Sequence, residues 1–220
     1  MLVQGTLQLP GDKSISHRAI MLSAIAEGVS CVRNLNDGAD LQSTINILKD
    51  CGASIQERDN EIVINGKELH SPSNDLDCGN SGTTTRLVAG LLASQKLTFS
   101  LIGDESLSKR PMKRIITPLT AMGCKISSND GLLPLSIDAS KGISAIDYDM
   151  KVASAQVKSS ILFSALGGNN VSSINEIIPT RNHSEIMLKN MGASIESEGS
   201  KIIVHPCLLY TSPSPRDRSS

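Results

Sequence analysis

The hydrophobic and polar positions of the chain repeat the same pattern three times. Three blocks align, at residues 47–65, 118–137 and 187–205, and their central glycines, Gly52, Gly123 and Gly192, lie about 70 residues apart. Each block has the pattern of an amphipathic helix end, a glycine that terminates it, a short strand, a polar turn and a second strand. A repeat of this length indicates three copies of one supersecondary unit.

Upstream of each block, a helix rich in small apolar residues is followed by a strand. The predicted helices are 14–27, 82–93 and 154–167, and the predicted strands are 29–35, 98–103 and 171–176. The unit is therefore βαβαββ-like, and three such units can bury their apolar helices together under an outer layer of sheets. We expect one α/β domain of three repeats over residues 13–206.

The first predicted helix carries the apolar spacing most clearly. Its spaced positions are Ile15, Ala19, Leu22 and Ala26, with Met21 and Ile25 beside them. Steps of three and four residues place such side chains on one face, so the pattern predicts one buried stripe.

The two ends of the chain depart from the repeat. Residues 1–12 contain an alternating strand that we expect to belong to another lobe of the protein. From Cys207 the sequence is rich in Ser, Pro and Arg and has no helical or strand period. Because 207–217 resembles an out-of-frame sequencing-adapter translation, we expect 207–220 to be a scar, with natural sequence continuing beyond Pro206. The alternative is a natural disordered tail.

Composition narrows the class of protein. The 220 residues are 39% hydrophobic and 20% charged, with a formal net charge of -1, as in ordinary globular proteins. Near-neutral charge argues against a nucleic-acid or membrane-surface protein, and the chain shows neither a membrane-length apolar run nor a secretory leader, so we expect a cytoplasmic location. The chain has five cysteines, Cys31, Cys51, Cys78, Cys124 and Cys207. They lack C-x-x-C spacing, which favours reduced, buried thiols.

Polar and basic residues gather where the three apolar helices are predicted to begin. These residues are Lys13, Ser14 and Arg18 in the first unit, Asn80, Gly82 and Thr83 in the second, and Ser154 and Gln156 in the third. A helix N-terminus offers unpaired N–H groups and partial positive charge, which attract phosphate or carboxylate. If approximate rotation relates the units, these helix starts converge on a pocket for a small polyanion.

Two arginines in turns add to this chemistry, and each cluster also has a simpler interpretation. Arg110 precedes a helix-starting proline and Arg181 opens the last helix, where a fixed guanidinium suits carboxylate or phosphate recognition. The simpler interpretation is helix capping with solvated lysines. For His17 and His183 a structural role is favoured over catalysis. The first cluster lacks the P-loop pattern, so nucleoside triphosphate binding has little support.

Four motifs resemble the 5-enolpyruvylshikimate-3-phosphate synthase family. They are PGDKSISHR (10–18), GNSGTTTR (79–86), GDESLSKRPM (103–112) and SAQVKSS (154–160). Together they cover nearly all of residues 1–206. Members of that family look like two lobes of three βαβαββ-type units, so the resemblance implies the first strand and one lobe, an N-terminal half.

The resemblance implies an activity and assigns residues to it. The activity is transfer of the enolpyruvyl group of phosphoenolpyruvate to the 5-hydroxyl of shikimate 3-phosphate with release of phosphate, in chorismate and aromatic amino-acid biosynthesis. It implies no metal or organic cofactor, a monomer, and a catalytic Lys13 that contacts both substrates. The other implied shikimate 3-phosphate ligands are Ser14, Arg18, Ser154, Gln156 and Arg181, and those for phosphoenolpyruvate are Asn80, Gly82, Arg110 and Gln156.

Two further expectations follow from the resemblance. The herbicide glyphosate occupies the phosphoenolpyruvate site in that family, and Gly82 is the permissive residue there, so we expect the full enzyme to be glyphosate sensitive. The acidic base and several Lys/Arg ligands belong to the family's second lobe. We therefore expect this fragment to bind shikimate 3-phosphate weakly and to turn nothing over.

Three alternatives remain open at this point. The sibling enolpyruvyl transferase acting on UDP-N-acetylglucosamine carries a lysine–asparagine pair and a loop cysteine that have no match around Lys13. A stand-alone module that binds shikimate 3-phosphate without catalysis would end near residue 206. A purely structural repeat domain would bind no ligand.

Overall fold

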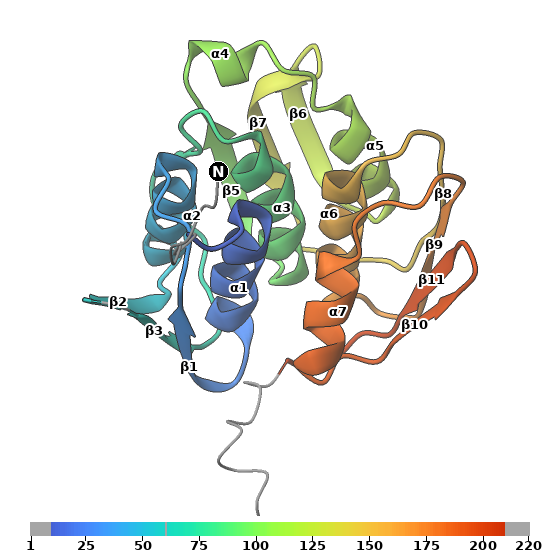
Figure 1. Ribbon diagram of the computed structural model, residues 1–220. Helices are drawn as coiled ribbons and strands as arrows, with labels where there is room; N and C mark the ends of the chain where they lie inside the picture. Colours follow the sequence, from blue (N-terminus) through green and yellow to red (C-terminus); the bar gives the residue numbers. More distant parts are fainter. Residues whose placement is uncertain (1–9, 60, 210–220) are drawn as a thin grey trace, which may run out of the picture.

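The computed structural model describes residues 10–59 and 61–209, and three repeated units make up this part of the chain (Figure 1). Each unit contributes one central helix, and these are α1 (Lys13–Ile25), α3 (Gly82–Ser94) and α6 (Ala155–Leu166). The three helices predicted from the apolar pattern are thus confirmed to within two residues at each end.

Each unit also forms a small sheet of its own. The first has the order β1 (Gly28–Arg33), β3 (Glu61–Gly66) and β2 (Ser54–Arg58). The second has the order β4 (Leu76–Asp77), β5 (Thr98–Ile102), β7 (Leu132–Asp138) and β6 (Lys125–Asn129). The third has the order β8 (Asp147–Met150), β9 (Ser172–Glu176), β11 (Lys201–Val204) and β10 (Ile195–Glu198). Neighbouring strands are antiparallel except for the parallel pairs β4–β5 and β8–β9.

A second helix in each unit leads into its closing hairpin. These helices are α2 (Ala39–Asp50), α5 (Lys113–Ala121) and α7 (His183–Asn190), and a short α4 (Glu105–Ser108) precedes α5. The second and third units follow the expected βαβαββ order, with α4 added, and the first follows it from α1 onward. Gly52, Gly123 and Gly192 follow these helices with φ of +91°, +101° and +88°. This left-handed backbone favours glycine, which explains the repeated glycine of the sequence pattern.

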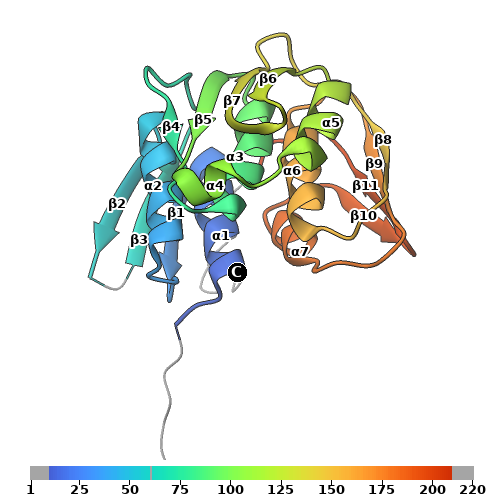
Figure 2. The ribbon, with the colours of Figure 1, turned by 90° about the horizontal axis from the view of Figure 1, so that it is seen from above.

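The central helices lie inside and the sheets outside, as expected. Figure 2 shows the three sheets around α1, α3 and α6 on different sides. Two glycines let α3 and α6 approach closely: a Cβ on Gly90 would lie 2.1 Å from the Ser160 carbonyl oxygen. A Cβ on Gly167 would lie 2.0 Å from the Ser94 carbonyl oxygen. The backbones of the two helices are therefore in contact, with no room for a side chain between them.

The single buried stripe expected on α1 is not what the structure shows. Ile15 is 43% exposed and Ala19 is half-buried, whereas Ser16, His17 and Arg18 are buried. In the first turns of α1 the buried side chains are polar, so burial there follows hydrogen bonds and not apolar spacing. Farther along, α1 is surrounded on nearly all sides, and every residue from Ile20 to Ala24 is buried.

The expectation of buried thiols is confirmed for Cys51, Cys78 and Cys124 and is wrong for Cys31. Burial raises the pKa of Cys51 and Cys78 to about 12 and that of Cys124 to about 11. Cys31 lies in the edge strand β1, on the face whose side chains are exposed to solvent. Cys207 is half-buried.

The two chain ends are described only in part. Most of the strand expected within residues 1–12 lies outside the described residues. Of the expected scar, Cys207 and Leu209 bond to the lobe: Cys207 N–H donates to Leu166 O (3.1 Å), and Glu27 N–H donates to Leu209 O (2.8 Å). Leu209 is 2% exposed. The adapter origin of 207–220 stays a prediction. No helix in the described part of the chain has the length and apolar character to cross a membrane.

Candidate functional site

The first turns of the central helices meet at one cavity of about 410 Å³. It is lined by Ser14 and Arg18 of α1, Thr83 of α3, Ala155 and Gln156 of α6, and Pro179, Thr180, Arg181 and His183 at the start of α7. The convergence of helix starts that the sequence predicts is therefore confirmed. Convergent N-termini and two arginines give this cavity a positive character suited to an anion.

Arg18 is the most constrained cation of the cavity. Its side chain is buried, and Nε donates to Ser184 Oγ (2.7 Å) while Nη2 donates to Ser159 Oγ (2.7 Å). Nη1 donates to the Ser14 carbonyl oxygen (2.8 Å). Burial lowers the pKa of Arg18, and the Glu185 carboxylate opposes that shift. A guanidinium has five N–H donors, so these bonds fix its plane and leave donors for a ligand.

Gln156 is oriented by partners on α3. Its Nε2 donates to Thr83 Oγ1 (2.9 Å), and its Oε1 accepts from Arg86 Nη1 (3.1 Å). Arg86 also donates to the carbonyl oxygens of Gly82 (3.1 Å) and Pro111 (3.2 Å). Sequence reasoning did not assign Arg86, although it ends the GNSGTTTR motif. The available signal was its spacing of four residues from Gly82, which places both on one helix face.

A second polar cluster lies beside the cavity. Arg110 Nη2 donates to Asn80 Oδ1 (2.5 Å), and Asn80 Nδ2 donates to Asp104 Oδ2 (2.6 Å). A Cβ on Gly82 would lie 2.6 Å from Arg86 Nη1 and 3.5 Å from Arg110 Nη1. Gly82 therefore leaves space next to two guanidinium groups. The structure brings Asn80, Gly82 and Arg110 together, but none of the three lines the 410 Å³ cavity itself.

Lys13 and Ser154, the two other predicted ligands, also lie outside the lining of that cavity. The Lys13 ammonium, half-exposed, is paired with the Asp40 carboxylate. Burial acts to raise the pKa of Asp40, but hydrogen bonds from Lys13 and Ser81 and the charge of Lys13 lower it on balance. Ser154 caps α6, because its Oγ accepts from the Val157 N–H (3.3 Å).

The two histidines near the site differ in environment. His17 is fully buried, and its Nδ1 lies 2.8 Å from Thr44 Oγ1. Burial, together with the nearby charge of Lys13, lowers the pKa of His17 to about 4, so the ring is neutral at neutral pH. This fits the structural role favoured for His17. His183 instead lines the cavity, where a binding role is open to it.

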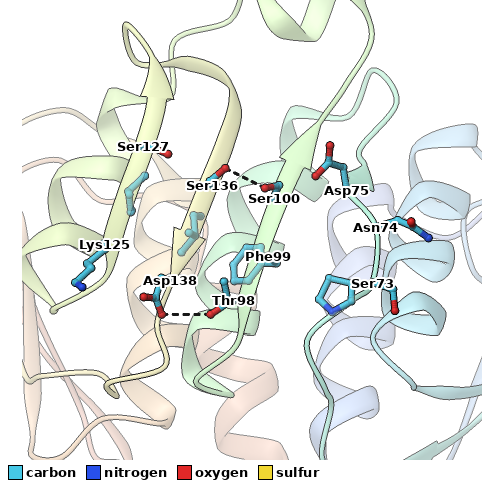
Figure 3. Close-up of a pocket in the computed structure, with 13 residues that line it drawn as sticks. Ser73, Asn74, Asp75, Thr98, Phe99, Ser100, Lys125, Ser127, Ser136 and Asp138 are labelled. Carbon is cyan, nitrogen blue, oxygen red and sulfur yellow. Dashed lines mark hydrogen bonds between the residues drawn. The ribbon is translucent and has the colours of Figure 1, made fainter.

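A larger cavity of about 610 Å³ lies on the second sheet (Figure 3). Its polar lining includes Lys125 with Asp75 and Asp138, and its Thr98 Oγ1 donates to Asp138 Oδ1 (3.2 Å). Carboxylates outnumber cations there, so this cavity does not suit an anion. Within residues 10–59 and 61–209 there is also no group of three or more His, Cys, Asp or Glu placed to hold a metal ion.

The chain matches a family model described as EPSP synthase (3-phosphoshikimate 1-carboxyvinyltransferase) over residues 2–212. It is 47% identical to 3-phosphoshikimate 1-carboxyvinyltransferase of Ruthia magnifica over 210 residues, which are 94% of this chain and 47% of that protein. It is 44% identical to the protein of the same name from Thermoanaerobacter sp. strain X514 over 207 residues, 93% of this chain and 49% of that one.

Solved structures agree with the sequence matches. EPSP synthase from Acinetobacter baumannii superposes with a TM-score of 0.89 at 42% identity and covers 94% of this chain and 48% of that chain. The chain spans about half the length of the curated relatives that it matches. Because the family model covers most of its residues, the chain belongs to the EPSP synthase family.

Proposed function

We propose that this chain is the shikimate 3-phosphate-binding half of an enzyme that transfers the enolpyruvyl group of phosphoenolpyruvate to the 5-hydroxyl of shikimate 3-phosphate, releasing phosphate. The observation that supports it most is the cavity of about 410 Å³, in which Ser14, Arg18, Gln156 and Arg181 meet. A phosphate group needs several fixed donors, and helix N-termini with arginines supply them.

The two substrates use neighbouring parts of the site in this proposal. Arg18 and Arg181 hold the anionic end of shikimate 3-phosphate, with Ser14, Ser154 and Gln156 donating to its oxygens. Phosphoenolpyruvate lies against Arg110, Asn80 and the open space at Gly82. Substrates with carboxylate and phosphate groups match both cationic areas, which explains why one lobe presents two of them.

Lys13 joins the two areas. In the ligand-free chain its ammonium is held by Asp40. When both substrates bind, their anionic groups compete with Asp40 for that ammonium, which then contacts both of them and stabilises charge in the transition state. The reaction protonates the vinyl carbon while the 5-hydroxyl loses a proton and attacks, so an acid and a base are needed. We place these groups in the half of the protein that this chain does not span.

Calorimetry with shikimate 3-phosphate tests the binding part of this proposal. We expect the chain to bind it, and Arg18→Met to weaken binding by about tenfold or more, because a charged hydrogen-bond set is lost. Lys125→Met, which changes the other cavity, is the matched control and leaves affinity unchanged. Absence of binding by the parent chain would refute the proposal and favour a purely structural repeat domain.

A chimera tests the catalytic part. Residues 1–206 are fused to the second half of the Ruthia magnifica relative, and phosphate release is followed with both substrates present. We expect release that requires shikimate 3-phosphate and is not supported by UDP-N-acetylglucosamine. Binding without turnover in the chimera would reduce the function to a binding module.

The monomeric state and the cytoplasmic location also remain predictions. Analytical ultracentrifugation checks the first, and cell fractionation checks the second.

A further inference from the structure

A buried lysine outside the proposed ligand set connects the elements behind the cavity. Lys158 of α6 is 1% exposed, and its ammonium lies 2.9 Å from Glu176 Oε2 and 2.6 Å from Glu185 Oε1. Glu176 is the last residue of β9, and Glu185 lies in the first turn of α7. One ammonium therefore binds both ends of the segment 177–184, which we call the wall segment.

The wall segment forms one side of the cavity. It contributes Pro179, Thr180, Arg181 and His183 to the lining. Its start has little apolar packing, because Ile177 is 69% and Ile178 is 61% exposed. Among the described residues, positions 177–182 make one side-chain hydrogen bond, from Thr180 Oγ1 to Glu176 Oε1 (2.5 Å). Such a segment depends on its two anchored ends for its position.

The ion pairs of Lys158 are also connected to Arg18, the most constrained cation of the cavity. Ser184, the neighbour of Glu185, accepts a hydrogen bond from Arg18 Nε. The charge of Glu185 also raises the pKa of Arg18 against the lowering caused by burial. The positive charges of Lys158 and Arg18 are thus balanced by the negative charges of Glu176 and Glu185. Charged groups in a protein interior need such partners, because burial without them is costly.

We propose that Lys158 is a positioning residue that fixes the wall segment, through Glu176 and Glu185, at the distance from Arg18 that the anionic end of shikimate 3-phosphate needs. The choice of ligand rests on the proposed function. Without the ammonium, Glu176 and Glu185 lose the ion pairs that tie both ends of the wall segment to α6. The wall segment then moves as a unit, and Thr180 and Arg181 leave their places relative to Arg18.

Amide hydrogen exchange of the ligand-free chain tests the positioning directly. Lys158→Met leaves two unpaired buried carboxylates and risks unfolding, so the decisive variant is Lys158→Met/Glu176→Gln/Glu185→Gln, which keeps the shape and removes the charges. We expect faster exchange in peptides covering 177–184 and unchanged exchange in α3 and β5. Lys49→Met, which breaks the exposed pair with Glu57, is the control and leaves 177–184 unchanged.

Affinity for shikimate 3-phosphate gives the second readout, at a temperature where every variant is folded. We expect the triple variant to bind on the order of tenfold more weakly, since a small displacement of a binding group is costly. A purely structural role predicts a lower melting temperature with unchanged affinity and unchanged exchange at 177–184, and that result would overturn the proposal. If the parent chain does not bind the ligand, the proposed function fails, and the exchange comparison alone decides whether Lys158 positions the segment.

Discussion

At the scale of single residues, the space beside Gly82 sets the shape of the proposed phosphoenolpyruvate area. A methyl group there would lie 2.6 Å from Arg86 Nη1, so the guanidinium would have to move. In the chimera we expect Gly82→Ala to raise the KM for phosphoenolpyruvate by about tenfold, as one added methyl can, with the KM for shikimate 3-phosphate little changed. Steady-state kinetics with each substrate varied checks this, and equal changes in both KM values would contradict it.

The same residue carries the inhibitor prediction. We expect the chimera to be glyphosate sensitive, because Gly82 leaves the phosphoenolpyruvate area open, and we expect Gly82→Ala to weaken inhibition. Turnover is measured at rising glyphosate and fixed phosphoenolpyruvate. Undiminished turnover of the parent chimera at millimolar glyphosate would show that the herbicide does not occupy this area.

His17 makes stability depend on pH. Its folded pKa is about 4 against an ordinary value of 6.5, so the unfolded chain binds more protons between these values. The contribution of His17 to the free energy of unfolding is therefore fully present above about pH 6.5. It decreases as the pH falls toward 4, by about 3 kcal/mol at most. Urea unfolding of the parent and His17→Gln at several pH values measures it: the advantage of the parent should shrink across this window. A pH-independent difference would contradict the assignment.

The residue scale also shows where sequence reasoning stops. Arg18 and Gln156, which line the cavity, could be singled out in advance because polar residues at a helix start have a recognisable pattern. Arg86 and Lys158 were missed, since what matters for them is partners on other elements, Gln156 in one case and Glu176 and Glu185 in the other. Contacts between elements that are distant along the chain leave no periodic signal in one sequence.

At the scale of elements, the glycine after each second helix is a local requirement. Gly123 has φ of +101°, and a Cβ there would meet its nearest atoms at 3.5 and 3.7 Å, which is ordinary contact. Gly123→Ala therefore tests backbone strain alone, and we expect it to lower the free energy of unfolding by about 1–2 kcal/mol. Gly123→Asn, which tolerates this backbone better, should lose less. Urea titrations of both variants decide, and an equal loss would point to packing instead.

Helices, strands and capping glycines were predictable because each follows a local period. The close crossing of α3 and α6 was not, because Gly90 and Gly167 look like ordinary small residues within apolar helices. Their importance comes from the Ser160 and Ser94 carbonyls on the facing helix. The exposure of Ile15 was missed because an apolar period does not show where along a helix burial begins.

At the scale of the whole molecule, Leu209 connects the chain's end to the lobe although its segment looks like a scar. Leu209 is 2% exposed and Leu208 is 67% exposed. We expect Leu209→Ala to lower the free energy of unfolding by about 2 kcal/mol and Leu208→Ala to change it little. Chemical denaturation of the two variants measures the difference. Equal effects would show that residues after Pro206 do not contribute to the core.

The threefold repeat has a consequence for symmetry. Three separate copies of one unit would surround a cavity with three identical walls, suited to a ligand with threefold symmetry. Joining the units in one chain lets every wall differ: Ser14 and Arg18 of α1 form one wall, Thr83 of α3 another and Gln156 of α6 a third. The ligand that we propose, with a phosphate at one end and a hydroxyl at another, needs unlike walls. Covalent fusion is what allows a symmetric architecture to recognise an asymmetric molecule.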